Sequence, residues 1–215
     1  MIALTRRSAR RLARDRGGIA MIEFALVFPL FLLFMLGAVE LTNFITVKLR
    51  VSQLALQIAD NAARIGAGSP LAAKQISEAD INDLFTGAQL ASTQLDLLKN
   101  GRVILSDLEP QANPNTAGRY KIVWQRCFGT RTAYASSYGR QGDQNLTGIG
   151  PTGRQATAQD DNATMFVEVR YRYAPIISTS WTPVFDLREI ASMAVRDRRD
   201  LTRVYNNERV AAATC

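Results

Sequence analysis

The chain has 215 residues, no histidine and a formal net charge of +7. Residues 1–18 hold six arginines and one aspartate, so they carry +5 of that charge, and the rest of the chain is close to neutral. This distribution gives a nucleic-acid-binding function little electrostatic support, and the absence of histidine excludes Ser-His and Cys-His nucleophile pairs.

Residues 19–47 are predicted to form a transmembrane helix. Between Glu23 and Lys48 the one charged residue is Glu40, and the run from Phe24 to Val39 is uncharged and mostly apolar. A helix needs about 20 such residues to cross a bilayer. We interpret Glu40 as the acid that marks the exit from the membrane, in preference to a functional role.

The arginine-rich leader predicts the orientation of this helix, because positive charge resists translocation. The N-terminus should stay in the cytoplasm and the C-terminal part should be exported to the periplasm. A cleaved secretory signal is the alternative reading. The apolar run is longer than an ordinary signal core and no A-x-A-like site follows it, so we expect the helix to remain as a single-pass anchor.

The junction between leader and helix reads Arg-Gly-Gly-Ile-Ala-Met-Ile-Glu-Phe from residue 16 to residue 24. It resembles the type IV prepilins, in which a membrane-embedded aspartyl peptidase cuts after the glycine. The wider pattern GGIAMIEFALVFPLFLLFMLGAVEL is similar to the TadE/TadF-type pilin-like proteins of the tight-adherence (Tad/Flp) pilus system. The resemblance implies that Gly18 ends the leader, Ile19 begins the mature chain and Glu23 is the family's helix glutamate.

The same resemblance implies a set of partners and a location. The partners are a prepilin peptidase, other pilin subunits, the Tad assembly machinery and the lipid of the bacterial inner membrane. No cofactor or metal is implied. The protein would then be a minor pilin or an assembly factor in pilus biogenesis and surface adherence, possessing a pilin-like fold.

Physical reasoning gives the three junction residues a mechanism. Cleavage would create an ammonium at Ile19, one helical turn from Glu23 on the same face. Two unit charges about 4 Å apart, at an effective dielectric constant near 20, attract by roughly 4 kcal/mol before the cost of desolvation is subtracted. A carboxylate in an apolar zone needs such a partner. The alternatives are an interfacial Glu23 that faces lipid headgroups and a plain linker at Gly17 and Gly18.

An amphipathic continuation of the helix is predicted over residues 48–65. Apolar residues recur there at steps of three, four and seven, and the Gly- and Pro-containing segment 66–70 should end the helix. A helix lying on the membrane surface is the alternative, but its polar face carries few lysines and arginines. We therefore expect this half to pack on the exported domain.

Residues 66–215 are predicted to form an exported α+β domain. Residues 71–99 should be helical, with Ser77 and Asp80 as a capping-box-like start. Alternating apolar and polar residues then predict strands, and we expect three or four antiparallel strands packed on the long helix. The expected strands are Val103–Leu108, Tyr120–Cys127, Phe166–Tyr173 and Ile190–Arg196, with 174–188 as a connection in which a cluster around Trp181 caps the core.

The stretch 128–163 is dominated by Gly, Ser, Thr, Asn, Gln and Asp. It has too few apolar side chains to bury and is expected to be a mobile loop, either disordered or used for contacts. Its glycine-rich segment 148–153 is a poor phosphate loop. Asp160 and Asp161 could form a glycosidase pair, but solvated loop acids are the favoured interpretation.

The chain has two cysteines, Cys127 and Cys215. In an oxidising exported compartment we expect them to pair within one chain. A buried free thiol at Cys127 and an intermolecular bond from Cys215 are the alternatives, and a metal site is disfavoured without histidine.

Three functions compete at this point. The minor pilin or assembly factor comes first, because of the junction. An uncleaved, signal-anchored periplasmic protein with a binding or structural role is second, and a membrane-tethered enzyme is third.

Overall fold

The computed structural model describes residues 17–68, 72–177 and 184–215. Most of the leader and the cluster around Trp181 therefore lie outside the described residues. The helices are α2 (Gly17–Ala62), α3 (Glu78–Ala91), the 3-10 turn η1 (Thr93–Leu95) and α4 (Leu97–Asn100). The strands are β1 (Gly101–Pro110), β2 (Tyr120–Phe128), β3 (Thr164–Tyr173) and β4 (Phe185–Ala194).

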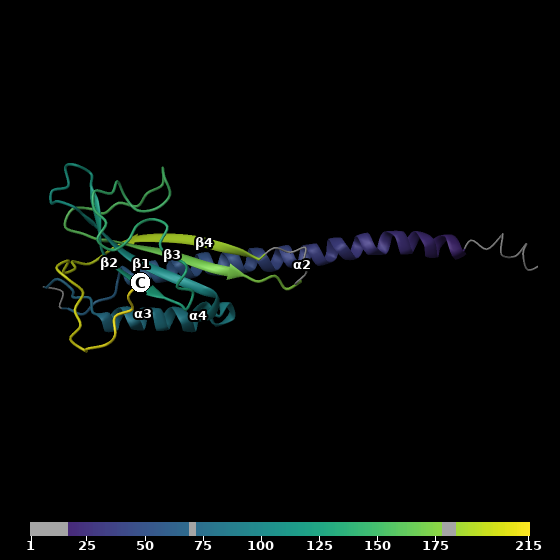
Figure 1. Cartoon of the computed structure of the whole chain (residues 1–215), viewed down its shortest axis with the longest axis horizontal. Coiled ribbons are helices and arrows are strands. Elements are labelled where there is room, and N and C mark those ends of the chain that lie inside the picture. Colours follow the sequence, from purple (N-terminus) through teal and green to yellow (C-terminus); the bar gives the residue numbers. More distant parts are fainter. Residues whose placement is uncertain (1–16, 69–71, 178–183) are drawn as a thin grey trace, which may run out of the picture.

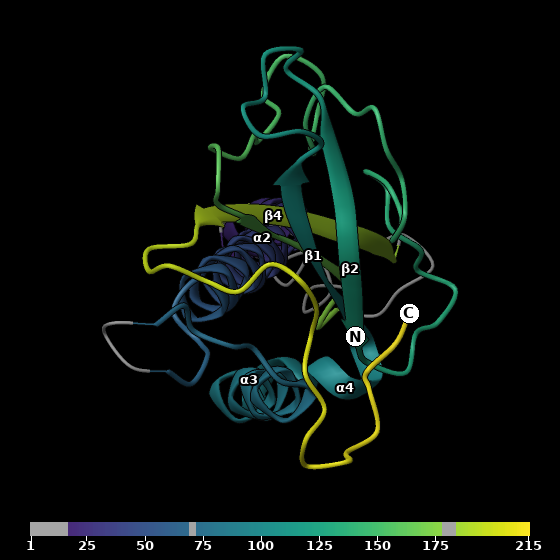
Figure 2. The ribbon, with the colours of Figure 1, turned by 90° about the vertical axis from the view of Figure 1, so that its left-hand side faces the viewer.

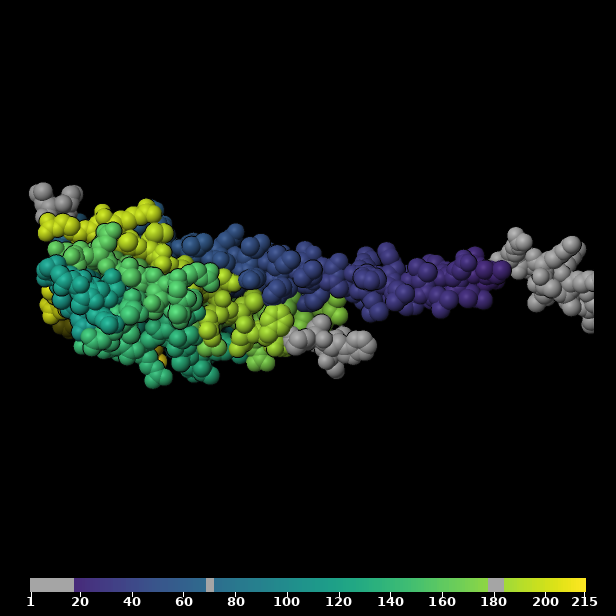
Figure 3. Space-filling view, turned by 90° about the horizontal axis from the view of Figure 1, so that it is seen from above, coloured from purple at the N-terminus to yellow at the C-terminus, as the bar shows by residue number. Residues whose placement is uncertain are grey.

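The long helix predicted from the sequence is confirmed. Helix α2 is continuous over 46 residues, with Pro29 inside it, and at 1.5 Å per residue it is roughly 70 Å long. Its first half stands outside the rest of the protein as a rod (Figures 1 and 3). Its second half lies along the sheet, so one helix joins a bare segment to a folded domain.

The four strands form one antiparallel sheet in the order β2-β1-β3-β4, which confirms the α+β prediction. The prediction for the last strand was wrong at its start. Strand β4 begins at Phe185, because Phe185 pairs with Tyr173 and Leu187 with Tyr171. The end of the predicted connection is thus part of the sheet.

The helix predicted over 71–99 is shorter and interrupted. The predicted capping box is present: the Ser77 hydroxyl accepts from the Asp80 N–H, and the Asp80 carboxylate accepts from the Ser77 N–H. Helix α3 therefore begins after Ser77, and the residues just before it are extended and bridge to the C-terminal segment. Asp96, at φ +46°, separates η1 from α4.

The core lies between the sheet and the two main helices (Figure 2). The second half of α2 buries the apolar stripe predicted from its periodicity, including Val51, Leu54 and Ile58. It packs on β3 and β4, and α3 packs beside it. Each inward strand residue, such as Val167, alternates with an outward one.

The stretch after β2 is packed against the outer face of the sheet. Strands β2 and β3 both run antiparallel to β1, which lies between them. They are parallel to each other, and parallel strands need a long crossover connection. The expectation of too few buried apolar side chains was wrong: Ile149 is fully buried and joins Leu108, Ile122 and Phe166 in a second apolar cluster.

A partly buried arginine, Arg199, holds the end of α2. The Nη2 atom of Arg199 donates to the carbonyl oxygens of Ala62 and Ile65 at 2.9 and 2.8 Å. Carbonyls at a helix C-terminus lack intrahelical partners and favour a cation. Arg199 also lies near the buried Asp107, whose charge opposes the lowering of the Arg199 pKa by burial. The C-terminal end of α2 is thus fixed to the core by these two hydrogen bonds as well as by packing.

Asp107 gives the domain a pH-dependent stability. Burial, followed by the charge of Glu109, raises the pKa of Asp107 well above its ordinary value, although Arg199 opposes the shift. The folded state therefore keeps this proton to a higher pH than the unfolded chain does. Stability from this group is full below about pH 4 and is lost as the pH rises through the raised pKa.

We predict that Asp107→Asn, which mimics the protonated acid, raises the melting temperature more at pH 8 than at pH 5. Each kcal/mol corresponds to about 2–4 °C for a chain of this size. The measurement is thermal unfolding of the full chain in detergent across this pH range. The exposed Asp83→Asn serves as the control. If the difference in melting temperature between Asp107→Asn and wild type stays constant with pH, the raised pKa of Asp107 is contradicted.

Candidate functional site

The bare half of α2 has the surface of a membrane span. Every residue from Ile19 to Val39 is exposed, and Glu40 is the first partly buried one. Within the described residues this is the one helix long and apolar enough to cross a membrane. At 1.5 Å per residue the exposed stretch is roughly 31 Å long, which matches a hydrocarbon core of about 30 Å.

The predicted processing residues lie at the outer end of this rod. Gly17 and Gly18 are the first two helical residues of α2, and a side chain added at Gly18 would meet no atom within 4 Å. Ile19 is 56% exposed. Glu23, one turn later, is also exposed, and among the described residues it has no ion-pair partner. Gly18, Ile19 and Glu23 are therefore all exposed at this end of the helix.

Glu40 does more than mark the end of the apolar run. Its carboxylate accepts hydrogen bonds from the Tyr173 hydroxyl and from the Ile177 N–H, the latter at 3.0 Å. Asn43 donates to the same Tyr173 oxygen at 2.8 Å. Burial, then the hydrogen bond to Glu40, raises the pKa of Tyr173 to about 12. The phenol is thus a permanent donor at neutral pH.

Aromatic rings surround this contact. The ring of Phe44 meets those of Tyr173 and Phe185 edge-on, with centroids 5.4 and 5.1 Å apart. The sheet end of the domain is therefore attached to α2 at the level where the bare half stops. Sequence reasoning missed this role of Glu40, because the alternation that predicts β3 does not show which helix residue its last tyrosine meets.

A disulfide joins Cys127 on β2 to Cys215, with the Cα atoms 4.9 Å apart and a sequence separation of 88. Sequence reasoning favoured this pairing over a free thiol. Beside it the Cys127 N–H donates to the Ala213 carbonyl at 2.7 Å. Strand β2 is an edge of the sheet, and an uncovered edge is prone to pair with other chains. The C-terminal segment covers part of it.

The same region contains a buried ion pair. The Arg126 guanidinium binds the Glu78 carboxylate through Nε, at 2.8 Å, and through Nη2. Glu78 begins α3, and its N–H donates to the Tyr205 carbonyl at 2.8 Å. The C-terminal segment, α3 and β2 therefore meet around one charge pair.

The remaining candidates have local partners. Asp160 accepts from the Asn115 N–H at 3.0 Å, and Asp161 accepts from the Asn113 amide. Both acids thus hold the loop to the β1–β2 connection, which is a structural use. In the part of the chain that the structure describes, no three metal-ligating side chains cluster.

One comparison with known proteins gives a match, and that match covers helix α2. Residues 18–67 match the model of the family described as TadE-like protein. The match takes in both halves of α2 and the turn after it, ends before α3 and the sheet, and spans well under half of the 215 residues. It confirms the resemblance seen in the junction and apolar run. No curated protein and no solved structure matches the chain.

The contact between Glu40 and Tyr173 leads to a stability prediction. Tyr173→Phe removes one hydroxyl and leaves Glu40 and Asn43 without their shared partner. We expect it to lower the free energy of unfolding by about 1–3 kcal/mol, measured by thermal or denaturant unfolding in detergent. Tyr171→Phe is the matched control, because Tyr171 is buried on the same strand face and its hydroxyl has no hydrogen bond among the described residues. Equal effects of the two substitutions would contradict the prediction.

Proposed function

We propose, from the TadE-like segment at residues 18–67, that the chain is a minor pilin or pilin-like assembly factor of a Tad (Flp) type IV pilus. It acts in pilus biogenesis and surface adherence. A prepilin peptidase removes the leader after Gly18. The mature protein then contacts other pilin subunits and the Tad assembly machinery.

One observation carries this proposal. A bare apolar rod from Ile19 to Val39 is continuous with a helical segment whose inward face is buried in the core of a folded domain. Such a rod can rest in lipid or pack sideways against similar rods without any change in the domain. This is the property that a subunit needs if it is stored in a membrane and later assembles.

The proposed location follows from the same segment and from the leader charge. The helix is a single-pass anchor in the bacterial inner membrane, with the N-terminus cytoplasmic and the domain periplasmic. The protein acts by assembly and is not an enzyme. This is consistent with the local partners of its candidate loop acids. The alternative is an uncleaved, signal-anchored periplasmic protein with a binding or structural role.

Processing after Gly18 can be tested with two neighbouring glycines. We predict that wild type and Gly17→Ala, recovered from membranes, begin at Ile19, whereas Gly18→Ala keeps its leader. The added methyl at Gly18 has free space in the helix, so it should affect recognition by the peptidase and leave the fold intact. N-terminal sequencing and intact mass give the answer. A wild-type protein that still begins at Met1 would select the uncleaved alternative.

The role of Glu23 is tested separately. We propose that its carboxylate pairs with the new ammonium of Ile19, in its own or a neighbouring subunit, inside the apolar zone. Glu23→Gln should be cut normally but recovered less in the assembled pilus fraction, since a pair of charges worth roughly 4 kcal/mol before desolvation is lost. Glu23→Asp, which keeps the charge, should be less affected. Equal cleavage and equal incorporation of Glu23→Gln and wild type would rule out the pairing.

A further inference from the structure

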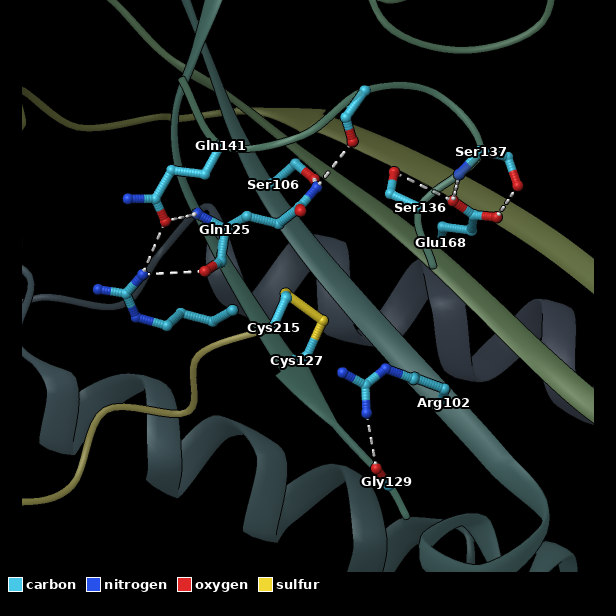
Figure 4. The surroundings of a disulfide bond; sticks show 12 residues. Arg102, Ser106, Gln125, Cys127, Gly129, Ser136, Ser137, Gln141, Glu168 and Cys215 are labelled. Carbon is cyan, nitrogen blue, oxygen red and sulfur yellow. Dashed lines mark hydrogen bonds between the residues drawn. A yellow bond between two sulfur atoms is a disulfide. The ribbon is translucent and has the colours of Figure 1, made fainter. Parts of the chain in front are cut away.

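A cavity of about 420 Å³, lined by both polar and apolar atoms, lies next to the disulfide. Its walls come from β1 and β2, from the segment 132–141 and from the last two residues of the chain. Figure 4 shows the Arg102 guanidinium beside the sulfur atoms of Cys127 and Cys215. The cavity is built by parts of the chain far apart in sequence, and it is closed on one side by the disulfide.

Arg102 is a buried cation without an acid. It is 5% exposed, its Nη1 atom donates to the Gly129 carbonyl at 3.0 Å, and its Nε atom has no partner. Among the described residues no carboxylate forms an ion pair with it. Burial alone lowers the Arg102 pKa. A buried charge normally has a partner of opposite charge. The buried guanidinium of Arg102 lacks such a partner among the described residues.

Further positive charge surrounds the same cavity. Arg140 lines it, and its guanidinium makes no hydrogen bond or ion pair with any other described residue. Arg170 lies directly opposite Arg102 across the β1–β3 ladder, stacked 4.5 Å from the centre of the Tyr134 ring. Like charges at paired positions of a sheet repel. A bound anion would relieve that repulsion.

The nearby acids are already engaged. Glu168 accepts from the Ser137 N–H at 2.9 Å and from the Ser137 hydroxyl at 2.7 Å, and it pairs with Arg188. Asp186 accepts from the Tyr134 hydroxyl. Glu168 and Asp186 therefore fix the loop and the strand edge. Cys215, which carries the terminal carboxylate, also lines the cavity, but among the described residues no ion pair joins that carboxylate to Arg102.

Other polar groups in the cavity add donors. The Gln141 side-chain oxygen accepts from the Gln125 N–H at 3.2 Å and from Arg126 Nη1 at 3.4 Å. This arrangement orients the Gln141 amide so that its NH₂ group remains a donor. An excess of donors and guanidinium groups is the pattern that binds planar or tetrahedral oxyanions.

We propose that this cavity binds an oxyanion, a carboxylate or a phosphate carried by a small ligand, through Arg102 and Arg140. The guanidinium of Arg102 supplies the buried charge, and Arg140 closes over the anion from the loop. The site uses the sheet domain alone, so it is independent of leader cleavage and of assembly.

The test is isothermal titration of the full chain in detergent micelles. The probes are glutarate, glucuronate and inorganic phosphate, with glucose as the neutral counterpart of glucuronate. We expect saturable binding of at least one anion and none of glucose. Tightest binding of glutarate or glucuronate identifies a carboxylate ligand, and tightest binding of phosphate identifies a phosphate ligand.

Three variants locate the binding. Arg102→Gln and Arg140→Gln should each weaken it at least tenfold, and Arg154→Gln, which removes an exposed loop charge outside the cavity, should leave it unchanged. Arg140 is exposed, so its variant retains the fold even if Arg102→Gln does not. No saturable binding of any of the three anions, equal binding of glucose, or unchanged binding in Arg140→Gln would overturn the proposal.

Discussion

Helix α2 is one continuous helix with an exposed apolar half and a half packed in the folded domain. The rest of the structure depends on how the packed half is held in place. The inward stripe around Val51 and Ile58 supplies the apolar contact with the sheet. At the C-terminal end of α2 the Arg199 guanidinium donates hydrogen bonds to the carbonyl oxygens of Ala62 and Ile65. Because packing and end-capping act together, the domain fixes the direction in which the bare half leaves it.

The level at which the helix changes environment is fixed by polar chemistry. Glu40 is too costly to leave in hydrocarbon alone, and the Tyr173 hydroxyl gives it a partner from the sheet. The same contact ties the end of β3 to the helix. The folded domain is thereby held at a fixed position relative to the exposed apolar half of α2.

Patterns within one segment could be predicted from the sequence, whereas contacts between segments could not. The apolar run, the stripe after Lys48, the Ser77 capping box and the alternation in β3 are local, and each was found. The packing of the stretch after β2 depends on strand order, which places β1 between β2 and β3. The polar composition of this stretch suggested a free loop. A few buried apolar residues, such as Ile149, are nevertheless enough to hold the crossover segment against the sheet. The partners of Glu40 and the unpaired charge of Arg102 depend in the same way on long-range placement.

The account rests on α2 passing from lipid into the domain at Glu40. The most direct measurement is a nitroxide scan of single positions from residue 22 to residue 58 in liposomes, with the native disulfide kept, comparing collisions with oxygen and with a water-soluble nickel complex. Positions from Phe24 to Val39 should be reached by oxygen and shielded from nickel, with the change at Glu40, and inward positions beyond Val51 should be shielded from both. Free access of the nickel complex to the Phe24–Val39 stretch would contradict the account.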